Sequence, residues 1–269
     1  MFAYLEILRP FNGLMSAFAV IISAILIGFF APLQIAIACF SVFLISSGGM
    51  VINDYFDYKI DRINRPKRVV TSGKISRKTA LNYSLSLFLI GIAAALFLNF
   101  YMFTLAIFNS LLLLIYSWKI KKTILIGNFI VSWLAASSFL FGSLLQEKIT
   151  ALILILFMMA FSSSIGREIA KSIEDVKGDR KMKLKTLPII AGNAFSAWIA
   201  CIFMIFAIIF TFLPYILNLL NIIYLYVVLI ADVIAAFSCF IIFISPKRSQ
   251  EMIKIAMLIV LIAFLIGTF

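Results

Sequence analysis

Apolar segments of about 20 residues recur along the whole 269-residue chain, separated by short polar stretches. A helix needs roughly 17 to 25 residues to cross the hydrocarbon of a bilayer. The hydrophobic fraction, 64%, also exceeds that of an ordinary soluble domain. The sequence therefore predicts an all-α, polytopic membrane protein with nine transmembrane helices. We expect these helices at 14–30, 33–51, 79–98, 100–118, 124–145, 149–166, 189–212, 219–244 and 251–269.

Positive charge is distributed unevenly over the two faces of this arrangement. Lys148 is the single exception among the 23 Lys and Arg residues, and the others fall on the face that carries the N-terminus. Cytoplasmic loops are enriched in Lys and Arg, so we expect that face to be cytoplasmic. All acidic residues except Glu147 and Asp232 share it. We also expect the first helix to be retained, since no cleavable signal peptide precedes it.

Composition excludes several kinds of site. The chain has no His, which rules out imidazole acid–base catalysis and His-based metal sites. Cys39, Cys201 and Cys239 lie inside predicted spans without metal-like spacing, so we interpret them as buried filler. The net charge of +12 is compatible with anionic lipid head groups and with an anionic substrate.

Two short acidic runs stand out at the ends of apolar segments. The first is Asn-Asp-Tyr-Phe-Asp-Tyr-Lys-Ile-Asp at 53–61, and the second is Asp-Val-Lys-Gly-Asp at 175–179. If the helix continues, Asn53, Asp57 and Asp61 form one stripe at i, i+4 and i+8, with Asp54 pointing about 100° away. Asp175 and Asp179 are again i, i+4. Arg65-Pro66 is expected to end or bend the first helix.

Carboxylates next to cations at a membrane edge are suited to Mg²⁺ shared with a polyanionic phosphate, because Mg²⁺ keeps waters and takes few protein oxygens. Arg and Lys then neutralise the remaining phosphate oxygens. The alternative is a solvated helix end with i, i+4 ion pairs such as Lys171 with Asp175. Two similar runs on one face favour the metal and phosphate interpretation.

These motifs carry a family resemblance. The string NDYFDYKIDRINRP at 53–66, the pattern RExxKxxEDxxGD at 167–179 and Thr-Leu-Pro at 186–188 resemble the UbiA superfamily of intramembrane prenyltransferases over essentially the whole chain. The resemblance implies a single domain over 1–269. Within the superfamily, Ile-Asp-Arg-Ile-Asn-Arg-Pro at 60–66 and Ser-Gly at 72–73 look most like the archaeal branch of digeranylgeranylglyceryl phosphate synthases.

The resemblance implies Mg²⁺-dependent transfer of a geranylgeranyl group from geranylgeranyl diphosphate to the hydroxyl of geranylgeranylglyceryl phosphate. That reaction forms the second ether bond of archaeal membrane lipids. The expected partners are the prenyl diphosphate donor, the lipid phosphate acceptor and membrane lipids, with no nucleic acid. Two Mg²⁺ ions are expected to bridge the diphosphate between the two acidic runs.

The acidic runs, the neighbouring cations, polar residues at helix edges and the resemblance together give candidate site residues. The expected metal ligands are Asn53, Asp54, Asp57, Asp61, Asp175 and Asp179. The expected catalytic residues are Asp57, Asp61, Asp175, Asp179 and Tyr116. The expected substrate-binding residues are Arg9, Asn12, Arg65, Lys67, Arg68, Lys121, Asn128, Arg167 and Lys171.

Two other functions stay open from the sequence. One keeps the fold and changes the acceptor to an aromatic ring, as in quinone or haem O synthesis. The other is a transporter of a phosphorylated or lipid anion. Transporters place polar groups near the bilayer midplane, whereas here the midplane is almost purely apolar, which favours an interfacial enzyme.

Overall fold

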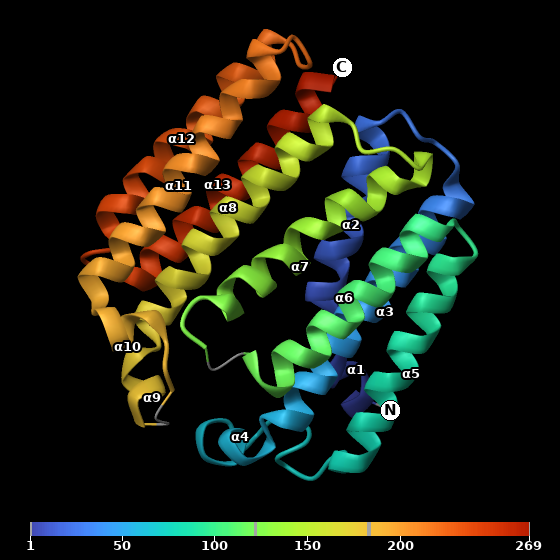
Figure 1. Cartoon of the computed structure of the whole chain (residues 1–269), viewed down its shortest axis with the longest axis vertical. Helices are drawn as coiled ribbons and strands as arrows, with labels where there is room; N and C mark the ends of the chain where they lie inside the picture. Colours follow the sequence, from blue (N-terminus) through green and yellow to red (C-terminus); the bar gives the residue numbers. More distant parts are fainter. Residues whose placement is uncertain (1, 121–122, 182–183, 269) are drawn as a thin grey trace. The chain divides into compact units, whose positions relative to one another are not determined.

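The computed structural model describes residues 2–120, 123–181 and 184–268, and the regular secondary structure within these ranges is helical throughout. The chain divides into two compact units (Figure 1). The first comprises Met1–Lys121 and Phe141–Lys148, and the second comprises Lys122–Leu140 and Ile149–Phe269. The all-α prediction is therefore confirmed.

The first unit is arranged around one long helix, α3. Its helices are α1 (Phe2–Leu8), α2 (Pro10–Leu26), α3 (Pro32–Phe56), α4 (Tyr58–Asn64), α5 (Arg77–Leu96), α6 (Phe100–Trp118) and the short η2 (Leu144–Gln146). Helices α2, α5 and α6 all pack against α3. Helix α3 is therefore packed on several sides, and its C-terminal end carries the first acidic run.

The second unit contains most of α7 (Ile126–Ser143) and all helices from α8 onward. These are α8 (Ala151–Glu174), α9 (Val176–Lys181), α10 (Leu187–Ala191), α11 (Asn193–Ile216), α12 (Ile222–Ile241) and α13 (Pro246–Thr268). Helix α8 packs against both α11 and α13, and α12 packs against α13. The C-terminal end of α8 carries the second acidic run.

Each of the nine predicted spans contains one long helix. Within the described ranges, eight helices are long and apolar enough to cross a membrane, or nine if the α1–α2 pair, bent by 52°, counts as one span. The two helices that lead into the acidic runs end later than predicted, because α3 continues to Phe56 and α8 to Glu174. The predicted span 189–212 is also shifted: a separate short α10 precedes it, and α11 starts after Gly192, whose φ of 87° suits glycine.

Small residues bring α3 and α5 close together. A Cβ on Gly91 of α5 would lie 2.8 Å from Cγ1 of Ile45 on α3. The Ser41 hydroxyl donates to the Gly91 carbonyl, and the Ser84 hydroxyl donates to the Gly48 carbonyl, both at 2.8 Å. Small residues with hydroxyl hydrogen bonds are the usual means of joining helices in lipid, where apolar side chains gain little from contact alone.

A polar contact joins α11 to α12 inside the second unit. Asp232 is 8% exposed and accepts a hydrogen bond of 2.8 Å from the Thr211 hydroxyl. The Tyr224 hydroxyl donates to the Thr211 carbonyl at 2.7 Å. Asp232, which the sequence placed away from the basic face, is therefore part of a helix–helix contact.

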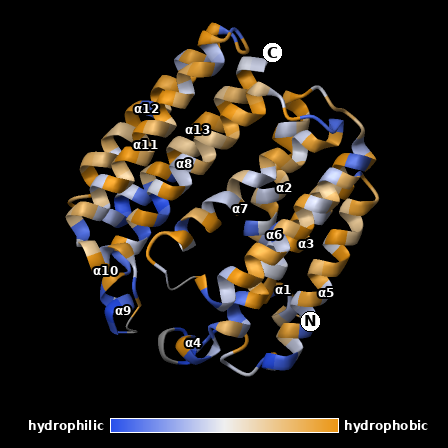
Figure 2. Ribbon diagram, viewed as in Figure 1, coloured by the Kyte–Doolittle hydropathy of each residue, from blue (hydrophilic) through white to orange (hydrophobic). Residues whose placement is uncertain are grey.

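Hydrophilic residues gather where the long helices of each unit give way to short ones. Figure 2 shows apolar helix bodies and hydrophilic ends at α4 and at α9. These short helices directly follow α3 and α8. The fold thus places both acidic runs where an apolar helix ends.

Candidate active site

The first acidic run spans a break between two helices. Helix α3 ends at Phe56 and α4 begins at Tyr58, so Asp57 lies between them with φ −77° and ψ 0°. Its N–H donates to the Asn53 carbonyl at 2.9 Å, and its carbonyl accepts from the Asp61 N–H at 2.8 Å. The i, i+4 spacing is therefore kept through the break. Helix α4 ends at Asn64, as Arg65-Pro66 predicted.

The second acidic run repeats this backbone geometry. Helix α8 ends at Glu174 and α9 begins at Val176, with Asp175 between them at φ −81° and ψ −2°. The Asp175 N–H donates to the Lys171 carbonyl and the Asp179 N–H donates to the Asp175 carbonyl, both at 3.0 Å. Gly178 lies within α9, so the break falls at Asp175 and the predicted i, i+4 relation of the two aspartates is retained.

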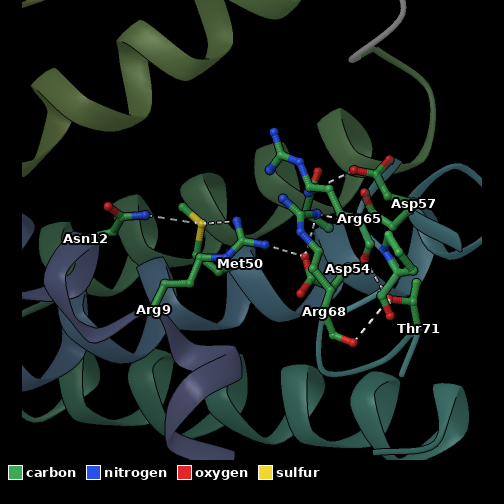
Figure 3. Close-up of polar contacts among 11 residues, drawn as sticks. Arg9, Asn12, Met50, Asp54, Asp57, Arg65, Arg68 and Thr71 are labelled. Carbon is green, nitrogen blue, oxygen red and sulfur yellow. Dashed lines mark hydrogen bonds and ion pairs between the residues drawn. The ribbon is translucent and has the colours of Figure 1, made fainter. Parts of the chain in front are cut away.

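Four charged residues of the first unit form a chain of ion pairs, which we call the Arg68 cluster (Arg9, Asp54, Asp61 and Arg68). Nη1 of Arg68 lies 2.5 Å from Asp61 Oδ2 and 3.3 Å from Asp54 Oδ1. Nη2 of Arg9 lies 2.5 Å from the same Asp54 oxygen. Figure 3 shows the guanidinium groups of Arg9 and Arg68 converging on Asp54. Asp54 and Asp61 are 3% and 5% exposed, so these are substantially desolvated pairs.

The structure adds contacts of Asp54 to the stripe predicted for Asn53, Asp57 and Asp61. Asp54 and Asp61 are seven residues apart, close to two helical turns, so they return to nearly the same side. Arg68 can therefore contact both. Asn53 instead donates from Nδ2 to Asp57 Oδ2 at 3.0 Å. Asn53 and Asp57 are therefore in contact within the stripe, while Asp54 is engaged by two arginines.

Arg68 owes its position to the loop that follows α4. Val69 and Val70, each 3% exposed, pack in an apolar cluster with Ile7 and Val51. The Thr71 hydroxyl lies 3.0 Å from the Arg65 carbonyl and closes the turn. The apolar anchor thus fixes the loop immediately after Arg68.

Arg9 reaches Asp54 from the bend between α1 and α2. Its backbone is left-handed, with φ 48° and ψ 63°, a costly conformation for a residue with a Cβ. Nη1 of Arg9 and Nδ2 of Asn12 also contact the sulfur of Met50, at 3.6 and 3.5 Å. The structure thus brings Arg9 to the first acidic run, with Asn12 beside it.

In the second unit, Glu168 organises the predicted phosphate-binding cations. Arg167 Nη1 lies 2.8 Å from Glu168 Oε1, and Lys171 Nζ lies 3.8 Å from Oε2. Lys171 therefore pairs with Glu168 and not, as the alternative interpretation supposed, with Asp175. Sequence reasoning missed Glu168, although its place between the two cations in RExxK was a usable signal.

Among the buried polar side-chain atoms of the second unit that lack a partner within the described residues are two donors from predicted substrate-binding residues. They are Nε of Arg167 and Nδ2 of Asn128, on α8 and α7. Buried polar groups are rarely left without a hydrogen bond, and water or a ligand commonly supplies the missing partner. Both residues were predicted to bind substrate, and their unused donors fit that role.

The remaining predicted residues are spread over both units. Tyr116 is half-buried near the end of α6, Arg65 and Lys67 are exposed in the loop after α4, and Asp179 is half-buried in α9. Arg65 and Lys67 also border a hollow of about 470 Å³ together with Arg68 and Glu6. Lys121 lies outside the described residues.

The donor set suits a hard cation only in part. Within the described ranges, no three Asp, Glu or Cys side chains are arranged to hold a metal ion. Asn53 and Asp57 nevertheless lie in contact, with Nδ2 of Asn53 donating to Oδ2 of Asp57, and carboxylate and amide oxygens are the donors that Mg²⁺ takes. These residues fit an ion that completes its shell with water and phosphate oxygens.

Known proteins resemble this chain over nearly its full length. Residues 14–265 match the UbiA prenyltransferase family. The digeranylgeranylglyceryl phosphate synthase of Methanopyrus kandleri is 37% identical over 98% of each chain, and that of Thermococcus kodakarensis is 38% identical over 99% of this chain and 98% of its own. A solved structure described as digeranylgeranylglyceryl phosphate synthase in membranes superimposes with a TM-score of 0.88 at 36% identity, covering 99% of this chain and 97% of its own.

A more distant structure shares the fold. A UbiA homolog from Archaeoglobus fulgidus bound to GPP and Mg²⁺ superimposes with a TM-score of 0.73 at 17% identity, covering 99% of both chains. The full-length matches and the two acidic motifs agree on one assignment, and the chain belongs to the UbiA prenyltransferase family.

Proposed function

We propose that this protein transfers a geranylgeranyl group from geranylgeranyl diphosphate to the hydroxyl of geranylgeranylglyceryl phosphate, forming the second ether bond of archaeal membrane lipids. The observation that carries the proposal is the 37–38% identity, over nearly the whole chain, to proteins named digeranylgeranylglyceryl phosphate synthase. The match to a UbiA family model supports prenyl transfer as the type of reaction.

The proposed cofactor is Mg²⁺, in two ions that bridge the diphosphate. Asn53, Asp57 and Asp61 would hold one ion, and Asp175 and Asp179 the other. Oxygen donors on two helix ends support this assignment, as does the homolog bound to GPP and Mg²⁺. When bound, the metal supplies charge stabilisation for the departing diphosphate.

The reaction itself breaks the bond between C1 of the prenyl group and the diphosphate oxygen. The acceptor hydroxyl then forms the ether bond to C1 and loses its proton, and diphosphate departs. The protein's contribution is to bind and neutralise charge that grows on the leaving group, which stabilises the transition state more than the ground state. We assign that role to Arg167 and Lys171, and to the unused donor of Asn128.

Other substrate contacts are proposed for further polar residues of the chain. They are Arg9, Asn12, Arg65, Lys67, Arg68, Tyr116 and Lys121. Apolar helix bodies would surround the isoprenoid chain and exclude water that would otherwise quench an allylic cation. A lipid acceptor and a lipid donor both suit a site at the end of apolar helices.

We further propose that the chain acts as a single domain with its N-terminus and acidic runs on the cytoplasmic side. The charge asymmetry supports this orientation, because Lys148 alone among 23 Lys and Arg residues falls on the other face. In a variant without native cysteines, a cysteine placed at Ser72 should react with a membrane-impermeant maleimide only after the cells are opened. Labelling in intact cells would reverse the orientation.

Product identity tests the function. Purified protein is incubated with labelled geranylgeranyl diphosphate and Mg²⁺, and is offered geranylgeranylglyceryl phosphate or, separately, 4-hydroxybenzoate. We expect label in digeranylgeranylglyceryl phosphate and no transfer after chelation of the metal. Label on the aromatic acceptor alone would move the enzyme to quinone synthesis, and no metal-dependent transfer to either acceptor would refute the enzyme proposal.

A further inference from the structure

Arg68 stands where a cation is needed. Its Nη1 contacts Asp61 at 2.5 Å and Asp54 at 3.3 Å, and its side chain is 19% exposed. Asp61 is one of the residues to which we assign a metal ion, yet its Oδ2 is already bound by a guanidinium. A carboxylate oxygen in a close ion pair with arginine is a poor metal ligand until the arginine moves.

The buried carboxylates explain why such a cation is present. Asp54, Asp57 and Asp61 are 3%, 8% and 5% exposed, and they lie within two helical turns of one another. Uncompensated charges at this burial are strongly destabilising, and like charges in proximity add to the cost. Among the described residues of the first unit, Arg68 is the cation that pairs with Asp61.

Asp54 gives Arg68 a second anchor. Asp54 is itself held by Arg9 at 2.5 Å, so its place does not depend on Arg68. The 3.3 Å contact to Asp54 would keep the guanidinium at the site after it leaves Asp61. Figure 3 shows Arg68 beside Asp54, in the loop that leads to Thr71, and the same Nη1 already contacts both carboxylates.

We infer that Arg68 is an internal counter-ion for Asp61, which must leave Asp61 when a divalent metal binds and which Asp54 then retains. Asp54 is accordingly a positioning residue for Arg68 and not a metal ligand. This inference rests on the metal site of the proposed function and departs from the sequence-based assignment of Asp54 as a ligand.

The inference predicts opposite effects for two members of one cluster. Arg68→Gln removes a competing cation and should tighten binding of Mn²⁺ alone, in the absence of diphosphate, by about tenfold, the scale of a close charge pair. Asp54→Asn leaves Arg68 with Asp61 as its only partner and should weaken Mn²⁺ binding several-fold. Both are measured by electron paramagnetic resonance titration of free Mn²⁺ with the purified full-length protein.

Three further variants distinguish a counter-ion role of Arg68 from a general effect of charge and from direct metal binding by Asp54. Lys74→Gln removes one positive charge from the same loop, where Lys74 pairs with Glu6 at 3.0 Å, and should change the affinity less than twofold. Asp61→Asn combined with Arg68→Gln should lose the gain in affinity. Asp54→Asn added to Arg68→Gln should have no further effect, whereas a true ligand would still weaken binding.

Thermal unfolding of each variant shows whether it is still folded. Arg68→Gln should unfold at a lower temperature than the parent protein without metal and should gain more from added Mn²⁺. Unchanged or weaker Mn²⁺ binding by folded Arg68→Gln, or an equal gain in Lys74→Gln, would overturn the inference. The proposed function fails separately, if the parent protein transfers no prenyl group in the presence of Mg²⁺.

Discussion

The two acidic runs share a backbone geometry and differ in how their charges are compensated. In each, a long helix ends one residue before an aspartate with ψ near 0°, and a short helix follows. Asp54 and Asp61 are buried and paired with arginines, whereas Asp175 is exposed. The shared geometry sets the spacing of the carboxylates, and the surroundings decide whether a carboxylate also contributes to stability.

This difference has a functional meaning. The first run requires an exchange of cations before Asp61 can take a metal, whereas Asp175 stands open to solvent. The cations near the second run, Arg167 and Lys171, are occupied by Glu168 instead. In the first run the arginines pair with the aspartates themselves. Near the second run the cations pair with Glu168 instead.

The largest expected effect is a loss of turnover, of similar size for substitutions at the two acidic runs. Asp57→Asn and Asp175→Asn each remove a carboxylate assigned to the metal, so each should lower turnover about a hundredfold or more, in line with metal and electrostatic terms of several kcal/mol. Turnover is measured with labelled donor at saturating Mg²⁺. Asp232→Asn is the matched control and should keep near-normal turnover, because Asp232 contacts Thr211 within the α11–α12 interface.

Near-normal turnover in both Asp57→Asn and Asp175→Asn would remove the metal assignment. A loss of turnover in Asp57→Asn alone would show that the two runs differ in function. It would mean that the exposed run serves the substrate without holding metal.

Substitutions at the two acidic runs should differ in their effect on thermal stability. Asp54→Ala leaves Arg9 and Arg68 without their shared partner, and breaking such a pair costs on the order of 2–3 kcal/mol, less than a fully buried pair because Arg9 is 32% exposed. For a protein of this size that corresponds to a melting temperature lower by roughly 5 °C or more. Asp175→Ala should move it by under about 2 °C. Equal shifts in thermal unfolding would show that the difference in burial has no energetic consequence.

A substitution at Glu168 should affect binding of the diphosphate donor more than turnover. Glu168→Gln removes the charge that holds Arg167 at 2.8 Å, so Arg167 becomes less well oriented toward a phosphate. We expect KM for the diphosphate donor to rise about fivefold, a loss near 1 kcal/mol, with kcat nearly unchanged. Steady-state kinetics with varied donor decide this, and a fall in kcat at constant KM would assign Glu168 to the chemical step.

Much of the fold was predictable because its signal is local. Apolar runs near 20 residues predicted nine helices, and the spacing of Asp175 and Asp179 survived in the structure. The ends of α3 and α8 were placed too early, because hydropathy falls at the acidic runs while the backbone stays helical to Phe56 and Glu174. The short α10 was missed because only Gly192, at positive φ, separates it from α11.

The site was less predictable because its contacts are not local. Arg9 and Asp54 are 45 residues apart in sequence, and nothing in the spacing of either residue indicates that they meet. Arg68 was recognised as a cation near phosphate, but its link to Asp61 depends on how Val69 and Val70 anchor the loop. The pairing of charges in the Arg68 cluster therefore required the tertiary structure.

The smallest effect is expected at an ion pair that resembles the Arg68 cluster in chemistry alone. Lys74 and Glu6 are joined at 3.0 Å, but their side chains are 52% and 50% exposed. Water and salt screen such pairs, so Glu6→Gln should change the free energy of unfolding by under about 0.5 kcal/mol, and thermal unfolding should shift by no more than about 2 °C. Asp61→Asn, which breaks a pair of similar length at 5% exposure, should shift it further in the absence of metal. A larger shift for Glu6→Gln would mean that the position of the pair on α1, and not its burial, controls stability, because α1 also supports the bend that delivers Arg9 to Asp54.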